Sequence, residues 1–176
     1  WSVSILFGLC FFYLIDPFIY LWLGDGYAID SIIVAMIAAN VVLIMARGAI
    51  DTFIGAYGLF HDIKAPLFEI AINLIVSIVL GIRFGAAGVL IGTFVSIFII
   101  IFLWKPYLLY KLEFAVSYLS YLKFLLKLIV PIFVIGAFLN QVDFVYKFTG
   151  GWGDFLLYAT QIGGVSVVLV SFYCLS

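Results

Sequence analysis

The sequence predicts an all-α polytopic membrane protein with six transmembrane helices, and three observations carry that prediction. Of the 176 residues, 68% are hydrophobic and 10% are charged, whereas a soluble domain is about half apolar and a quarter charged. The mean hydropathy of the chain is +1.36. Six apolar runs meet or approach the roughly 20 residues that a helix needs to cross a bilayer: 3–23, 31–58, 67–84, 86–104, 124–141 and 154–176.

Composition and motifs also exclude several functions. A net charge of -1 provides no excess of positive charge for binding nucleic acid. The sequence holds no nucleophile elbow, zinc-protease motif, phosphate loop or Cys/His cluster, and its loops are too short for a catalytic domain. We therefore expect no enzyme, no cofactor and no metal site. Cys10 and Cys174 lie in apolar runs and are expected to be small core residues.

The ends of the chain indicate a piece of something longer. It begins at Trp1 without an initiator methionine or a basic stretch leading to a cleavage site, and it ends at Ser176 within an apolar run. We expect residues 1–176 to form a single membrane domain, as a fragment of a larger protein.

Turn residues separate the first three spans. The first run ends at Gly24-Asp25-Gly26, which favours a turn. The second run is longer than one bilayer thickness, which predicts tilt or an extension into the interface. Pro66 is expected in the first turn of the third span, where its missing N–H costs nothing.

The fourth span is expected to pack closely on a neighbour. Only Arg83-Phe84-Gly85-Ala86 separates it from the third span, so the two form a tight antiparallel hairpin. Gly88, Gly92 and Ser96 form a small-residue stripe that allows close helix approach. Trp104-Lys105-Pro106-Tyr107 is expected to end the span at an interface, with an interfacial linker over 105–123. Pro131 should kink the fifth span.

The distribution of basic residues predicts the orientation. Short cytoplasmic loops carry an excess of lysine and arginine. One side of the predicted topology holds Lys64, Lys105, Lys111 and Lys123, and the other holds Arg83 and Lys147. The first side, and with it both ends of the segment, is expected to be cytoplasmic.

Arg47 and Asp51 are the main candidates for function, because a charge within a span normally faces a bundle interior or a cavity. At 100° per residue, Asn40, Arg47 and Asp51 share one face of the second span. Asp51 is placed to pair with Arg47 at i,i+4. Two interpretations stay open: an ion pair that holds the bundle together, or a cavity-facing cation that its carboxylate releases to an anion.

Three further polar residues are candidates. Asp16, next to Pro17 in the first span, is either a proton or sodium site or the partner of an arginine elsewhere. On the third span, Glu69, Asn73 and Ser77 repeat every four residues along one edge. For Glu69, an ordinary helix start favoured by the helix dipole is the simpler alternative to a substrate ligand.

An ordered set of short segments resembles a known family. These segments are AYGLFHDIKAPLFE at 56–69, NL at 73–74, SIVLG at 77–81 and FGAAGVLIGT at 84–93, flanked by LWLG at 21–24 and WKP at 104–106. Together they resemble the polysaccharide-transporter family, the Wzx-type oligosaccharide flippases of the MATE-like exporter superfamily. The resemblance covers most of residues 1–125.

The resemblance implies a C-terminal part of a MATE-like bundle with two helical lobes around a cavity. It implies transport of an oligosaccharide on an undecaprenyl pyrophosphate carrier, from the cytoplasmic to the outer leaflet of a bacterial-type inner membrane, by alternating access. Cationic residues line the cavity in that family, and Arg47 is the position that matches the role, with Asn40 and Asn73 as further cavity residues. Asp51, Asp16 and Glu69 would then be candidates for coupling to H+ or Na+, or charge partners.

Three alternatives remain at this point. A MATE-type antiporter of small cationic drugs should have a site dominated by carboxylates and aromatic residues. A membrane-embedded glycan polymerase or ligase needs a substantial polar outer loop, whereas the loop at 142–153 is short and apolar. A non-transporting assembly subunit should pack its polar stripe shut.

Overall fold

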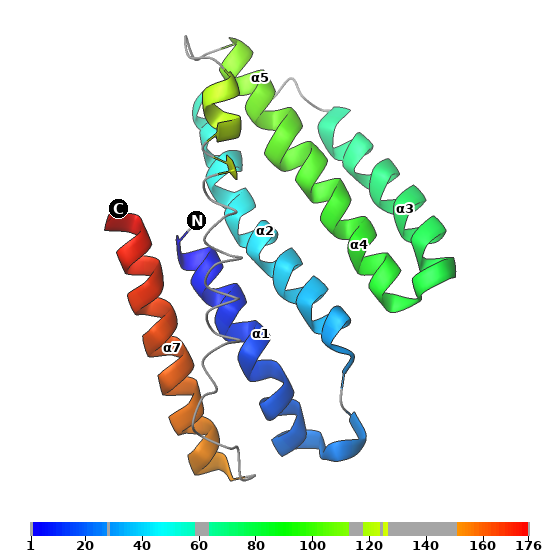
Figure 1. Ribbon diagram of the computed structural model, residues 1–176. Helices are drawn as coiled ribbons and strands as arrows, with labels where there is room; N and C mark the ends of the chain where they lie inside the picture. The colour runs from blue at the N-terminus through cyan, green and yellow to red at the C-terminus, as the bar shows by residue number, and fades with distance from the viewer. Residues whose placement is uncertain are drawn as a thin grey trace. The chain divides into compact units, whose positions relative to one another are not determined.

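The computed structural model of the chain describes residues 2–27, 29–58, 64–112, 118–123, 125–126 and 151–175. These residues are helical apart from short turns, and no strand occurs among them (Figure 1). Within the described ranges, four helices are long and apolar enough to cross a membrane: Val3–Leu23, Ser31–Ala56, Lys64–Phe84 and Ala86–Lys111. The all-helical fold is confirmed, and these helices indicate a membrane protein.

The helices α1 and α2 follow the first two predicted runs closely. α1 (Ser2–Leu23) ends at Gly24, whose φ of +88° suits glycine, and the short helix η1 (Asp25–Tyr27) follows. α2 (Ser31–Ala56) begins after Asp30, whose carboxylate accepts a hydrogen bond from the Ile32 backbone N–H at 3.1 Å. This is an N-cap, since the carboxylate satisfies one of the unpaired donors at the helix start.

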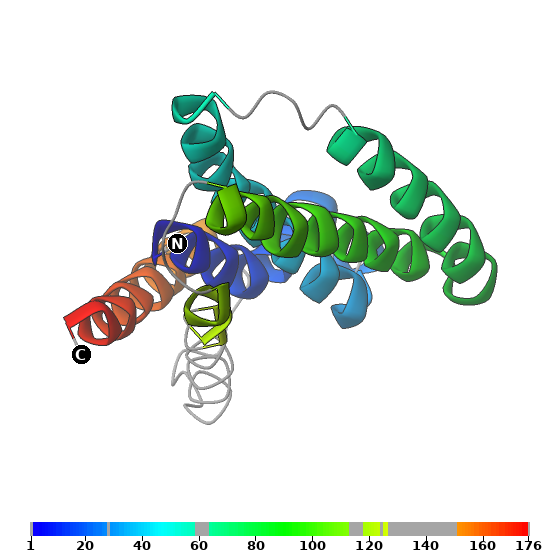
Figure 2. The ribbon, with the colours of Figure 1, turned by 90° about the horizontal axis from the view of Figure 1, so that it is seen from above.

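The next helices form the predicted hairpin. α3 (Lys64–Phe84) holds Pro66 in its first turn, as predicted. Gly85, with a φ of +60°, connects it to α4 (Ala86–Ile97). α3 and α4 lie side by side in both ribbon views (Figures 1 and 2). A Cβ at Gly88 would overlap the backbone of Leu80, and one at Gly92 would overlap the backbone of Ser77. The small-residue stripe is therefore a packing surface, as predicted.

One expected boundary is wrong. The fourth span does not stop at Trp104-Lys105-Pro106-Tyr107: α4 passes into a π-helical segment, η2 (Phe98–Trp104), and then into α5 (Lys105–Leu112). The backbone N–H of Lys105 donates to the carbonyl of Ile100, five residues back, which is the π-helical spacing. A wider helical turn ahead of Pro106 thus lets the helix run on past a residue that normally interrupts it.

The chain forms two compact units, each described by itself. One comprises Trp1–Ala38 and Lys127–Ser176, and the other Ala39–Leu126. In the first unit α1 packs on α7 (Trp152–Leu175), and Phe18 makes ring contacts with Trp152 and Phe155 at 6.4 and 6.1 Å. The single membrane domain predicted over 1–176 stays a prediction.

The two remaining predicted spans have different outcomes. α7 occupies the place of the predicted span at 154–176, although it is not among the four spans given above. The span at 124–141, with the kink expected at Pro131, lies outside the described residues apart from 125–126. Six transmembrane helices and two lobes therefore stay predictions.

Candidate functional site

Four charged side chains from three helices form one ion-pair network in the second unit. Arg47 on α2 donates from Nε to Asp51 Oδ2 at 3.0 Å and from Nη1 to Glu69 Oε1, on α3, at 2.9 Å. Lys105, the first residue of α5, donates from Nζ to the other oxygen of Asp51. Charges alternate along the network in the order Glu69, Arg47, Asp51, Lys105. We call this set the charge network.

Helix geometry explains why these residues meet. Arg47 and Asp51 are one turn apart on α2, which confirms the predicted i,i+4 pair. α3 begins at Lys64, so Glu69 lies beyond the first turn and faces Arg47 instead of the helix start. The hairpin then returns the chain to the same end of the unit, where α5 begins with Lys105.

The network has no net charge, because two cations balance two carboxylates. This balance matters in a membrane, where an isolated charge on a span costs roughly 2.5 to 3.5 kcal/mol on insertion scales. Lys105 and Glu69 are the most enclosed members, with 13% and 16% of their side chains exposed, whereas Arg47 and Asp51 are 33% and 39% exposed. The centre of the network is thus its most accessible part.

One nitrogen of the Arg47 guanidinium, Nη2, remains available to a ligand. Its Nε and Nη1 atoms are bonded to carboxylates, while its Nη2 makes no hydrogen bond among the residues that the structure describes. A guanidinium binds phosphate oxygens through two parallel N–H groups. A two-point contact of an anion with Nε and Nη2 therefore requires Asp51 to leave Nε.

The predicted cavity residues Asn40 and Asn73 lie in helix contacts. Asn40, 5% exposed, donates from Nδ2 to the carbonyl of Leu90 on α4 at 3.0 Å. The hydroxyl of Ser77 lies 2.9 Å from Asn73 Oδ1 and 3.2 Å from the carbonyl of Val89. These polar groups join α2 and α3 to the α4 backbone, and their assignment as cavity residues stays a prediction.

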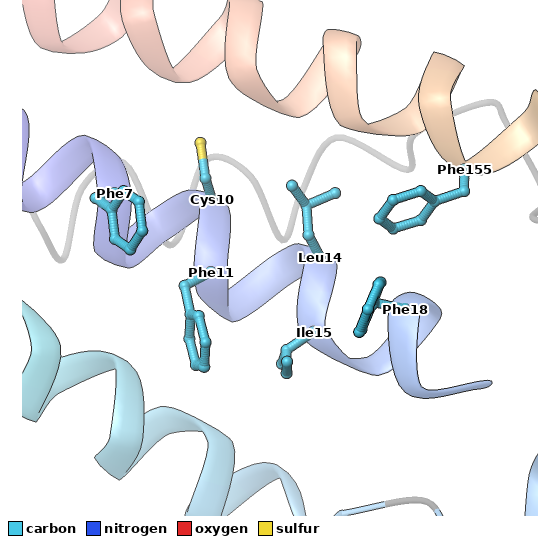
Figure 3. A pocket seen from close by; sticks show the side chains of 7 residues that line it. All are labelled: Phe7, Cys10, Phe11, Leu14, Ile15, Phe18 and Phe155. Carbon is cyan, nitrogen blue, oxygen red and sulfur yellow. The ribbon is translucent and has the colours of Figure 1, made fainter. Parts of the chain in front are cut away.

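Asp16 belongs to the other unit, where it is exposed on α1. The same unit holds a pocket of about 270 Å³ lined entirely by apolar surface (Figure 3). Its walls come from α1 and α7: Phe7, Cys10, Phe11, Leu14, Ile15, Phe18 and Phe155. Nothing in this lining binds a charged or polar ligand, and no group of three or more metal-ligating side chains occurs among the described residues.

The sequence placed Lys105 at an interface and among the basic residues that predict the orientation, but it did not predict the contact of Lys105 with Asp51. The sum of the charges on neighbouring spans is the sequence signal that could have predicted this contact. Arg47 with Asp51 and Glu69 leaves one negative charge in excess, and Lys105 is a cation at the matching end of the neighbouring span.

Comparisons of the chain with protein-family models, with curated proteins and with solved structures gave no match. Functional inference therefore rests on the charge network and on the sequence resemblance.

Proposed function

We propose that this chain is part of a membrane transporter that moves an oligosaccharide linked to a polyprenyl pyrophosphate from the cytoplasmic to the outer leaflet, by alternating access. The observation that carries the proposal is the charge network: a guanidinium on a helix long and apolar enough to cross a membrane, held between carboxylates of two helices and one-third exposed. Charged residues within membrane helices are costly and often mark substrate or ion pathways. The sequence resemblance supplies the substrate class.

The arrangement of partners suits anion binding. When a pyrophosphate takes Arg47 from Asp51, that carboxylate keeps Lys105 as its counter-charge. Glu69 has no second cation among the described residues, so losing Arg47 leaves it unbalanced. Glu69 is therefore the group that must be neutralised by a proton or a sodium ion when the anion binds, which makes it the preferred coupling site over Asp51.

Export of lipid-linked glycan by cells tests the role of Arg47. The full-length protein that carries this chain is expressed with Arg47→Ala, Arg47→Lys or Arg83→Ala. We expect Arg47→Ala to abolish export and Arg47→Lys to retain a small part of it, because a lysine ammonium keeps the positive charge but lacks the planar pair of N–H groups that binds a phosphate at two points. Arg83→Ala is the matched control, an exposed arginine in the last turn of α3.

Protein levels in the membrane are measured in parallel by immunoblot. Normal export by both Arg47 variants at normal protein levels would remove the arginine from the mechanism. Loss of resistance to cationic drugs, with glycan export intact, would favour the MATE-type antiporter instead.

A further inference from the structure

A proline interrupts the longest helical path of the second unit at the point where the charge network begins. Pro106 follows Lys105 and has no backbone N–H. In an α-helix the N–H of residue 106 would serve the carbonyl of Phe102, four residues back, and in a π-helix that of Ile101. A buried backbone carbonyl without a donor destabilises the fold, so another group has to replace the missing donor.

Two tyrosines of the following segment supply hydroxyl donors at this place. The Tyr121 hydroxyl donates to the carbonyl of Phe102 at 3.0 Å, and the Tyr118 hydroxyl donates to the carbonyl of Leu103 at 3.1 Å. Phe102 is fully buried and Tyr121 is 9% exposed. Burial raises the pKa of the Tyr121 phenol further above neutral pH.

Ring contacts hold both hydroxyls in position. The Tyr118 and Tyr121 rings are stacked with centroids 5.8 Å apart. Tyr110 and Tyr107, on α5, meet them at 5.6 Å (Tyr110 to Tyr121) and 5.5 Å (Tyr107 to Tyr118). Aromatic pairs at such spacings stabilise one another beyond the area that they bury. The donors are thus fixed relative to α5, the helix that begins with Lys105.

We propose that Tyr118 and Tyr121 form a hydroxyl latch that holds the junction between η2 and α5, where Pro106 supplies no backbone donor, and that this junction directs Lys105 onto Asp51. A π-helical segment accommodates extra residues per turn, and a shift of one residue turns everything beyond it by about 100° around the helix axis. If the junction lost these two donors and its register shifted by one residue, Lys105 would point away from Asp51. The latch would then control whether Asp51 has a partner other than Arg47.

The latch acts in the same way whatever substrate the proposed transporter carries. It assigns Tyr118 and Tyr121 as positioning residues, which act on Asp51 through Lys105. With such a latch, the helix from α4 to α5 can shift its hydrogen-bond pattern by one residue without unfolding, because only a few hydrogen bonds are exchanged for others.

Chemical labelling of lysine tests the latch directly. The purified full-length protein in detergent is treated with an amine-acylating reagent, and the modified fractions of Lys105 and Lys64 are compared by mass spectrometry. Lys105 is shielded, whereas Lys64 is exposed at the start of α3, outside the helix that would turn, and serves as an internal standard. In Tyr118→Phe/Tyr121→Phe we expect the ratio of Lys105 to Lys64 labelling to rise at least threefold.

Two further variants separate the latch from general loss of structure. Tyr107→Phe changes a ring of the same cluster whose hydroxyl makes no hydrogen bond among the described residues, and it should leave the ratio unchanged. Pro106→Ala supplies a backbone N–H that can replace the Tyr121 hydroxyl at the Phe102 carbonyl, so Tyr118→Phe/Tyr121→Phe should raise the labelling ratio less in this background than in the parent protein. If the double tyrosine variant leaves the ratio unchanged, or raises it equally in both backgrounds, the proposal is overturned.

Discussion

Removing Lys105 should destabilise the protein by disturbing the charge balance of the whole network. In Lys105→Met the remaining three charges sum to minus one, while Asp51 keeps its bond to Arg47. Exposed ion pairs contribute about 0 to 1 kcal/mol, and breaking a buried pair costs about 3 to 5 kcal/mol. With 13% and 39% of the two side chains exposed, we expect a loss of about 1 to 2 kcal/mol in the free energy of unfolding.

Charge balance further predicts coupling between residues that share no contact. Lys105 and Glu69 lie at opposite ends of the network, joined only through Asp51 and Arg47. Glu69→Gln alone leaves one positive charge in excess, whereas Lys105→Met/Glu69→Gln leaves the neutral Arg47–Asp51 pair. The double variant should therefore lose about 1 kcal/mol less than the two single losses added together.

Thermal unfolding in detergent measures these differences, since 1 kcal/mol corresponds to about 2 to 4 °C in Tm for a chain of 150 to 250 residues. Lys64→Met is the matched control, because Lys64 is an exposed lysine at the start of α3 without an ion pair among the described residues. It should shift stability by less than about 0.5 kcal/mol. Additive losses in the double variant would show that the pairs act independently, and the network argument would be refuted.

Two other predictions follow from packing and from titration. Gly92→Ala places a Cβ on the backbone of Ser77 and should lower the free energy of unfolding by about 1 to 3 kcal/mol, measured by thermal unfolding. Gly48→Ala has open space around the new Cβ and should be neutral or stabilising. Equal effects of the two substitutions would contradict the close α3–α4 approach. Burial, with the phenols of Tyr118 and Tyr110 beside it, raises the pKa of Tyr121 in the folded state. As pH rises, Tyr121 ionises first in the unfolded chain, so the free energy of unfolding should fall above pH ~10, by about 1.4 kcal/mol per pH unit. Denaturant unfolding between pH 9 and 11 should show a shallower fall for Tyr121→Phe than for the parent protein. Identical slopes would count against the burial of Tyr121.

The helices were predictable because each is an apolar run between turn residues. Gly24, Pro66 and Gly85 act through their own backbone chemistry, so their positions fixed the ends of α1, α3 and α4 without knowledge of the fold. Pro106 misled the same reasoning. Its effect on the helix depends on donors from Tyr118 and Tyr121, which come from a later segment and have no local signature.

The candidate site was predictable only where it is local. The Arg47–Asp51 pair follows from helical spacing, because residues four apart share a face. The contact of Glu69 with Arg47 and the contact of Lys105 with Asp51 depend on how the α3–α4 hairpin packs on α2, and spacing along the chain carries no information on that. Summing the charges of neighbouring spans recovers part of this tertiary information.

The neutrality of the network restricts how the proposed transporter can work. A cluster with a spare positive charge would attract a pyrophosphate outright and hold it, whereas a balanced cluster gains excess negative charge as soon as the anion arrives. In the proposed cycle, uptake of protons or sodium ions by Glu69 would restore the balance, and their release on the other side of the membrane would return Arg47 to its carboxylates. Substrate binding and ion binding are then linked through one guanidinium, and linkage of this kind is reciprocal. As long as the latch holds Lys105 on Asp51, that carboxylate keeps a counter-charge and the exchange is confined to Glu69.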